Sequence, residues 1–229
     1  MTERAAVPGD TGDSGGGDSG GGPEAAAVGP DAREAEERDA LARVAAGEAE
    51  AFALVVERHE ERLLRVCRRM LGDPEAARDA AQEVFLKAYR NAGRYRPRGK
   101  VYTWLYRIAV NHCLNRLRRQ RVVRFLPWSG MGGGGDGEAA EAGPAFDPPG
   151  HEPAADDRLA ARQRWRRVQR ALAELPDTQR AVVVLVRFEG LSYKETAEVL
   201  GVSLGAVESR LFRAMRNLES ALAGEEGEG

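Results

Sequence analysis

One segment of the sequence combines aromatic and basic side chains without any acid. Residues 96–111 read RPRGKVYTWLYRIAVN, with four basic residues, two tyrosines and one tryptophan. Such residues suit a polyanion, because an aromatic ring can stack on an exposed nucleic-acid base while Arg and Lys bind phosphate oxygens. A stacked base typically contributes about 1 to 3 kcal/mol to binding. The segment therefore predicts a surface for opened or single-stranded nucleic acid.

A helical wheel divides this segment and the residues after it into two faces. One broad arc is mainly apolar and is expected to face the core: Tyr102, Tyr106, Val110, Cys113, Leu114 and Leu117. The opposite stripe carries one aromatic ring among polar groups: Trp104, Arg107, Asn111, Asn115 and Arg118. We expect the tryptophan to stack on a base while its neighbours bind base edges and phosphates. The pattern alone leaves a second interpretation open, in which the ring packs against a neighbouring helix and the arginines only solubilise it.

The segment before this helix is also basic. Residues 93–100 read GRYRPRGK, and their Gly and Pro residues predict a loop. Four of its side chains could clamp bases or phosphates: Arg94, Arg96, Arg98 and Lys100. Around the loop, residues 84–124 hold twelve Arg and Lys residues and no Asp or Glu. A segment with only positive charges attracts a polyanion. It therefore favours binding of nucleic acid over the interpretation in which the tryptophan only packs against a neighbouring helix.

Upstream, polar side chains cluster on one face of a predicted helix. Asp79, Gln82 and Glu83 are spaced by three and four residues, opposite an apolar face. Clustered carboxylates can hold the metal ions of a nuclease. However, the basic segment adds no third acid, and no catalytic His or Lys stands at a suitable spacing. We therefore interpret the three residues as a contact surface for a protein and expect no catalytic residue.

The remaining composition gives no indication of a cofactor, a metal site or a membrane segment. Cys67 and Cys113 lie among apolar neighbours and are interpreted as buried structural thiols. No window approaches the roughly 20 apolar residues of a membrane span. The N-terminal residues also lack the apolar stretch of a signal peptide. We therefore expect a cytoplasmic protein with no metal, no cofactor and no membrane insertion.

The basic, aromatic and carboxylate residues described above lie in one segment with helical periodicity. Residues 38–124 carry apolar side chains at helical spacing, with breaks at Gly47, Gly72–Pro74 and Pro97–Gly99. These breaks predict three main helices after a short leading one. No alternation typical of β-strands competes with this pattern.

A second helical segment covers residues 158–222, with breaks at Leu175–Pro176, Gly190 and Gly201. Within it, SYKE at residues 192–195 matches a capping box, so a helix begins at 192 or 193. Gly201 is suited to end that helix in the left-handed conformation, and Ser203 is suited to cap the next one. Two short helices joined by such a turn describe a helix-turn-helix motif.

The second helix of this motif turns basic and polar side chains outward. They are Ser209, Arg210, Arg213 and Arg216. Arginine in a major groove can bond guanine with two hydrogen bonds or hold a phosphate. Periodicity alone leaves open the alternative that these residues form the solvated face of an ordinary helix hairpin.

The chain as a whole is predicted to be all-α, with two small helical domains. A bundle of three to four helices and a four-helix domain are joined by a flexible linker, and both termini are acidic. Residues 1–40 alone contain ten acids and three arginines, a net charge of −7, and the tail lacks the large apolar residues needed for ordering. The predicted boundaries are 1–36 (disordered acidic tail), 37–124 (first domain), 125–157 (linker), 158–222 (second domain) and 223–229 (acidic tail).

Three motifs together resemble bacterial sigma factors of the sigma-70 family, specifically the extracytoplasmic-function (group 4) branch. They are DAAQEVFLKAYRN, YTWLYRIAVNHCLNRLRR and LPDTQRAVVVLVRFEGLSYKETAEVLGVSLGAVESRLFRAMRNL. The resemblance spans residues 38–124 and 158–220 in the same order. It implies two helical domains, called regions 2 and 4, in a protein that binds core RNA polymerase, directs it to promoters and helps to open the DNA.

The resemblance also implies a role for each cluster. Asp79, Gln82 and Glu83 would dock on the clamp helices of the polymerase β′ subunit, and region 4 would dock on the β flap. The basic loop and the helix after it would melt and read the −10 promoter element by capturing flipped bases. Region 4 would read the −35 element through Ser203, Ser209, Arg210, Phe212 and Arg213. An anti-sigma factor is a further expected partner.

Two residues depart from the family pattern. Glu208 stands where relatives often carry a basic residue, so it would repel phosphate, although it could accept a hydrogen bond from cytosine N4. Thr196 replaces the Ile that is common before the Ala of the first helix. Two other functions are weaker alternatives: a stand-alone helix-turn-helix regulator leaves residues 75–119 unexplained, and a nucleic-acid enzyme lacks a catalytic cluster.

Overall fold

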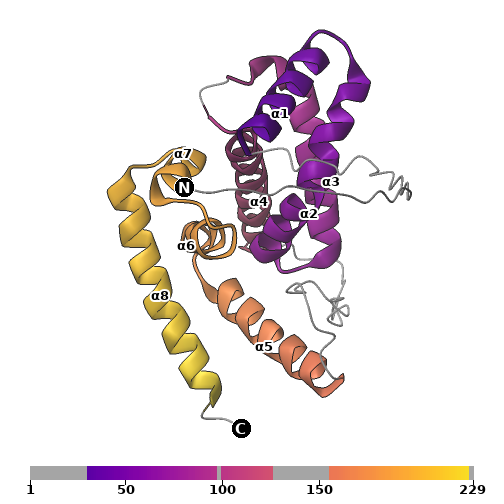
Figure 1. Ribbon diagram of the computed structural model, residues 1–229. Helices are drawn as coiled ribbons and strands as arrows, with labels where there is room; N and C mark the ends of the chain where they lie inside the picture. Colours follow the sequence, from indigo (N-terminus) through magenta and orange to yellow (C-terminus); the bar gives the residue numbers. More distant parts are fainter. Residues whose placement is uncertain (1–29, 97–98, 126–154, 227–229) are drawn as a thin grey trace, which may run out of the picture.

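The computed structural model describes residues 30–96, 99–125 and 155–226, and the regular structure in these ranges is helical (Figure 1). The prediction of an all-α protein is confirmed. Most of the predicted N-terminal tail, most of the linker and Arg98 lie outside the described residues. Among the helices that are described, none is long and apolar enough to cross a membrane.

In the first half of the described chain, helices begin and end at glycine, proline and capping residues. Its elements are α1 (Pro30–Ala45), η1 (Ala49–Ala51), α2 (Phe52–Leu71), α3 (Pro74–Arg90), η2 (Ala92–Arg94) and α4 (Val101–Phe125). Gly72 ends α2 with a φ of 78°, a left-handed conformation that favours glycine. The Asp73 carboxylate then accepts hydrogen bonds from the amides of Glu75 and Ala76 at 3.2 and 3.0 Å, which caps α3.

Helices α2, α3 and α4 pack into a bundle because α3 presents small side chains to its neighbours. The buried face of α3 consists of Ala76, Ala77, Ala80, Ala81, Val84 and Ala88. Larger buried side chains from α2 and α4 fill the remaining space: Leu63, Val66, Met70, Leu105, Tyr106 and Val110. Cys67 and Cys113 are buried free thiols in this core, as predicted. A hydrogen bond with Cys67, together with burial, raises the pKa of Cys113, so this thiol stays protonated.

Helix α1 begins earlier than the sequence indicates. Residues 30–36 were expected in the disordered tail, whereas the structure places them in α1. The Glu34 carboxylate accepts the amide of Val101 at 2.8 Å, and Glu36 forms an ion pair with Arg58. These partners lie far away in sequence, so composition alone could not reveal that the acids hold the helix in place.

The second half of the described chain contains the predicted helix-turn-helix. Its elements are α5 (Ala155–Glu174), α6 (Asp177–Val183), the π-helical turn η3 (Val184–Phe188), α7 (Tyr193–Leu200) and α8 (Leu204–Glu226). The capping box is present: Ser192 Oγ accepts the Glu195 amide at 3.2 Å, and the Glu195 carboxylate accepts the Ser192 amide at 2.9 Å. Gly201 ends α7 with a φ of 64°. Ser203 Oγ accepts the amide of Ala206 at 3.3 Å at the start of α8.

The two halves pack against each other, with α6 and α7 beside α4 (Figure 1). Five apolar residues of the second half join the core of the first: Ala181, Val184, Leu185, Leu191 and Val199. A smaller core holds the second half together: Leu172, Leu175, Val182, Val183, Val207, Leu211 and Ala214. The second half therefore has a core of its own and also covers part of the first half.

Candidate nucleic-acid and protein interfaces

The outer stripe of α4 is polar and open to solvent along much of its length. Asn111, Asn115 and Arg118 are exposed, and Arg118 Nη1 donates to Asn115 Oδ1 at 3.4 Å. Arg94 and Arg96, in the segment before the helix, are exposed as well. Since α4 contains no acid, these groups form a positive surface with free donors and acceptors for phosphates and base edges.

Trp104 lies where the basic loop joins this helix. Its ring is half-buried and packs against Tyr95, with ring centroids 5.3 Å apart and planes 59° apart. The Tyr95 hydroxyl donates to the carbonyl of Gly99 at 2.7 Å, which ties the loop to the start of α4. The tryptophan is therefore neither fully exposed nor a core residue. It also packs against the edge of the core.

Two of the predicted nucleic-acid residues already contact the second half of the chain. The Lys100 ammonium lies 3.4 Å from the carboxylate of Glu195, and the Arg107 guanidinium donates to the backbone carbonyl of Glu198. Both partners belong to α7. The structure thus brings the polar stripe of α4, predicted to bind nucleic acid, and the first helix of the helix-turn-helix together, which the sequence did not indicate.

The predicted protein-contact residues lie on the outer face of α3. Asp79, Gln82 and Glu83 are all exposed. Two large apolar residues continue the same face: Leu86 is 46% exposed and Tyr89 is 40% exposed. These two residues were not predicted, although Leu86 follows Gln82 and Glu83 by four and three residues and Tyr89 follows Leu86 by three, which was a usable signal. Apolar side chains exposed beside carboxylates are typical of a protein-binding surface.

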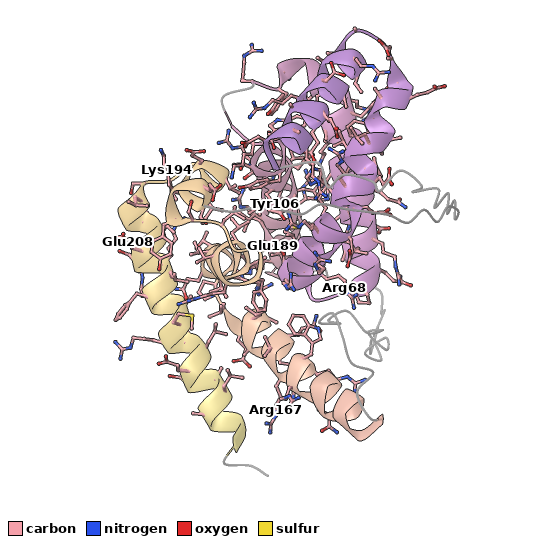
Figure 2. All side chains as sticks on the ribbon, viewed as in Figure 1. Arg68, Tyr106, Arg167, Glu189, Lys194 and Glu208 are labelled. Atoms are coloured by element: carbon pink, nitrogen blue, oxygen red, sulfur yellow. The ribbon has the colours of Figure 1, made fainter. Side chains whose placement is uncertain are left out.

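The helix-turn-helix presents its predicted −35 residues at the surface, with one exception. Ser203, Ser209, Phe212 and Arg213 are exposed, whereas Arg210 is half-buried. Phe212 is 65% exposed. Glu208 is exposed too and lies on the outer side of α8 (Figure 2). The exposed face of α8 thus combines an aromatic ring with basic and polar side chains.

A buried polar cluster joins the two halves and was not predicted. The carboxylate of Glu189 binds the Arg69 guanidinium at 2.7 Å, and both side chains are almost fully buried. The Tyr106 hydroxyl donates to the same carboxylate at 2.8 Å (Figure 2). Burial, with the nearby carboxylate, raises the pKa of Tyr106, so the hydroxyl stays a donor. The guanidinium also lies over the rings of Phe188 and Trp165, at 4.6 and 5.6 Å from their centroids.

Glu195 forms a second polar contact between the halves. Its carboxylate accepts a hydrogen bond from the Tyr102 hydroxyl. This bond lowers the pKa of Glu195 to about 2, with further contributions from Ser192 and Lys100. Glu195 is therefore ionised at neutral pH, where it both caps α7 and binds α4.

Two family models match the chain, one for each half. "Sigma-70 region 2" matches residues 55–122, which contain all of α3 and nearly all of α2 and α4. "Sigma-70, region 4" matches residues 165–218, which contain the helix-turn-helix. The α3 face, the α4 stripe and the −35 residues all lie inside the matched segments.

Relatives match across both halves. The ECF RNA polymerase sigma factor SigM of Mycobacterium tuberculosis is 39% identical over 189 residues, covering 82% of this chain and 86% of that protein. The RNA polymerase sigma-H factor of Pseudomonas aeruginosa is 34% identical over 192 residues, covering 82% of this chain and 94% of that protein. Each match therefore runs through both halves of this chain and covers most of the relative's length.

A solved structure shares the fold. CnrH in complex with the cytosolic domain of CnrY superposes with a TM-score of 0.57 and 26% sequence identity, covering 82% of this chain and 98% of that one. In that structure the similar protein is held by a partner protein.

Proposed function

Because the chain belongs to the extracytoplasmic-function branch of the sigma-70 family and is an alternative sigma factor for transcription initiation, we propose that its two domains divide promoter recognition between them. Residues 37–124 act as region 2, residues 158–222 as region 4, and residues 125–157 connect them. One observation carries the proposal: the polar stripe of α4 lies in the segment that matches region 2, and the exposed face of the helix-turn-helix lies in the segment that matches region 4. Since both regions match, a stand-alone helix-turn-helix regulator is set aside.

The outer face of α3 is proposed to bind core RNA polymerase. Asp79, Gln82 and Glu83 would bind polar and basic groups of the β′ clamp helices, while Leu86 and Tyr89 would be buried in the contact. Exposed apolar side chains of this size gain free energy when a partner removes them from water. The surrounding carboxylates then fix the orientation of the partner and add to the rate of association.

The α4 stripe and the loop before it are proposed to open and read the −10 element. The residues are Arg94, Arg96, Arg98, Lys100, Trp104, Arg107, Asn111, Asn115 and Arg118. Taking a base out of the duplex costs a few kcal/mol. Stacking on Trp104 and charge contacts with the displaced strand would offset that cost. The amide side chains of Asn111 and Asn115 supply both donors and acceptors for base edges.

Region 4 is proposed to read the −35 element with α8 in the major groove. Arg210 and Arg213 would bind guanine or phosphate, Phe212 would contact a thymine methyl group, and the polar residues Ser203 and Ser209 would bind phosphates. Glu208 would accept a hydrogen bond from cytosine N4, so it would act as a specificity determinant rather than as a phosphate contact.

The partners of the chain follow from this proposal. They are core RNA polymerase, through the β′ clamp helices and the β flap, and promoter DNA. The protein would act by binding rather than by catalysis, in the cytoplasm, where transcription takes place. An anti-sigma factor is proposed as a further partner, because the structurally similar CnrH is held by the cytosolic domain of CnrY.

The test is reconstitution with purified core polymerase. We expect the protein to co-purify with core enzyme and to support run-off transcription from a promoter identified by sequencing transcripts after overexpression. Tight binding of promoter DNA by the protein alone, with no affinity for core enzyme, would contradict the proposal.

A further inference from the structure

Helix α1 supplies a cap for the first turn of α4. The Lys100 carbonyl accepts the amides of Thr103 and Trp104 at 3.1 and 3.3 Å. The amide of Val101 has no acceptor inside its own helix, because it belongs to the first turn. Its acceptor is the Glu34 carboxylate of α1, at 2.8 Å. A carboxylate in this position satisfies a free amide and also faces the positive end of the helix dipole. Glu34 therefore fixes the start of the helix that carries the polar stripe.

A second side chain of α1 reaches the loop before α4. The Arg38 guanidinium lies one turn after Glu34, with Nε 3.3 Å from the Glu34 carboxylate. A hydrogen bond with the Tyr95 hydroxyl raises the pKa of this guanidinium, so Arg38 stays charged. The same hydroxyl donates to the carbonyl of Gly99 at 2.7 Å, which is possible because a hydroxyl can accept one hydrogen bond while it donates another. Tyr95 is thus tied both to α1 and to the end of the loop.

Both contacts lead to Trp104. Its ring packs on the ring of Tyr95, with centroids 5.3 Å apart, and its backbone lies in the first turn of α4. The side chain of Glu34 is only 16% exposed, so it is poorly placed to touch DNA itself. An effect of Glu34 on a bound strand would therefore pass through the residues that it holds.

Helix α1 is a firm support for these contacts. Ala40, Leu41 and Val44 of α1 are buried in the core of the first half, together with Ala92 of η2. The helix packs against both α2 and η2. Because α1 is anchored by its apolar face, the polar side chains at its start act from a fixed position.

We propose that Glu34 and Arg38 are positioning residues for the −10 element, because they hold the start of α4 and the Tyr95 ring on which the tryptophan packs. The inference rests on the proposed function, which assigns Trp104 to a flipped base. A ring whose orientation is set before the base arrives loses less freedom on binding than a ring that the base must order. Removing the support should therefore slow the capture of the base and leave earlier steps unchanged.

Four variants separate positioning from simple electrostatics. Glu34→Ala removes the cap, whereas Glu34→Gln removes the charge and keeps an oxygen that can accept the Val101 amide. Tyr95→Phe removes one hydroxyl and keeps the ring. Asp39→Ala is the matched control, because it removes a carboxylate from an exposed position of the same helix. Charge alone predicts that the loss of an acid near DNA strengthens binding, which is the opposite of the effect expected from lost positioning.

The measurement is the opening of a promoter by holoenzyme reconstituted from core polymerase and each full-length variant. A 2-aminopurine base in the −10 element reports opening, because its fluorescence rises when it leaves the stack. We expect Glu34→Ala and Tyr95→Phe to open the promoter about fivefold more slowly, as for the loss of a cap or a hydrogen bond. Glu34→Gln and Asp39→Ala should open it within about twofold of the unmodified rate.

Affinity for core polymerase and binding of the duplex promoter before it opens should change less than about twofold in all four variants. An unchanged or faster opening rate in Glu34→Ala, or an equal loss in Asp39→Ala, would overturn the proposal. If Glu34→Ala lost its affinity for core polymerase through misfolding, Tyr95→Phe would decide the question, because it removes a single hydroxyl. Opening at the unmodified rate by Tyr95→Phe would then overturn the proposal.

A double variant tests whether Glu34 acts through Trp104. Glu34→Ala combined with Trp104→Ala should open the promoter within about twofold of the rate of Trp104→Ala alone, because coupled residues are not additive. A loss equal to the product of the two single losses would overturn the inference. If Trp104→Ala alone left opening unchanged, the assignment of α4 to the −10 element would fail and this inference with it. If Trp104→Ala slowed opening while Glu34→Ala and Tyr95→Phe did not, only this inference would fail.

Discussion

At the scale of residues, the position of Trp104 is the most informative feature of region 2. Its ring packs on Tyr95 and remains partly exposed. A ring held in this way loses little further freedom when a base stacks on it, because its orientation is already set. This position of the ring supports the proposed stacking role, and a helical wheel does not show it.

Replacing Trp104 tests its role. Trp104→Ala should slow the formation of open complexes about tenfold, since one stacked base contributes roughly 1 to 3 kcal/mol. Binding to closed, double-stranded promoter should change less than about twofold. The measurement is permanganate reactivity of the −10 region with reconstituted holoenzyme, and Trp104→Phe, which retains a ring, is the control. Equal losses in closed and open complexes would mean that the tryptophan is structural.

At the scale of elements, each helix end is determined by a few residues close in sequence. The capping box of α7 illustrates this, since Ser192 and Glu195 satisfy each other's amides. The boundaries at Gly72, Gly201 and Ser203 follow the same local rules and were readable from the sequence. By contrast, the start of α1 depends on contacts with Val101 and was not.

Ser192→Ala tests the cap. We expect the free energy of unfolding to fall by about 1 kcal/mol, because the Glu195 amide loses its acceptor at the start of α7. Urea denaturation followed by circular dichroism measures the change. Ser220→Ala, at an exposed site within α8, should change stability by less than about 0.5 kcal/mol. A similar loss in the two variants would show that the cap contributes nothing specific.

The α3 face is tested by its apolar members. Leu86→Ala should weaken binding to core polymerase about five- to tenfold, as expected for an apolar residue buried at a contact. Leu222→Ala removes an equally large exposed side chain from α8 and should leave the affinity unchanged. Titration of fluorescent protein with core enzyme measures both. If Leu222→Ala weakened binding as much as Leu86→Ala did, the α3 face would not be the docking site.

At the scale of the whole molecule, the arrangement of the two domains depends on ionised side chains. The pKa of Glu195 is lowered to about 2, mainly by the hydrogen bond from Tyr102. A lowered pKa means that ionised Glu195 stabilises the packing of the two domains at pH values above its ordinary pKa, near 4.5, and that this contribution disappears as the pH falls towards 2. Lys100 faces the same carboxylate and stays charged across this range.

The packing of the two domains should therefore depend on pH. Energy transfer between fluorophores on Glu57→Cys in α2 and Glu219→Cys in α8, both exposed positions, should be constant from pH 7 to about 5 and should then fall as the pH approaches 2. Glu195→Gln should lack this component, so the difference between the two curves isolates it from the other carboxylates. Identical curves for the two proteins would show that Glu195 does not hold the domains together.

The sequence by itself determined the helical class, the capping and turn residues, the polar stripe of α4 and the acidic cluster of α3. These features depend on periodicity and on neighbours within four residues, which a linear chain displays directly. Only the tertiary structure decided that Glu189 binds Arg69 and Tyr106 and that α7 covers one flank of α4. Contacts between residues more than 80 positions apart, such as Tyr106 with Glu189, leave no local pattern. Tyr106 belongs to the predicted core face, but no residue near it in the sequence points to Glu189 as the acceptor for its hydroxyl.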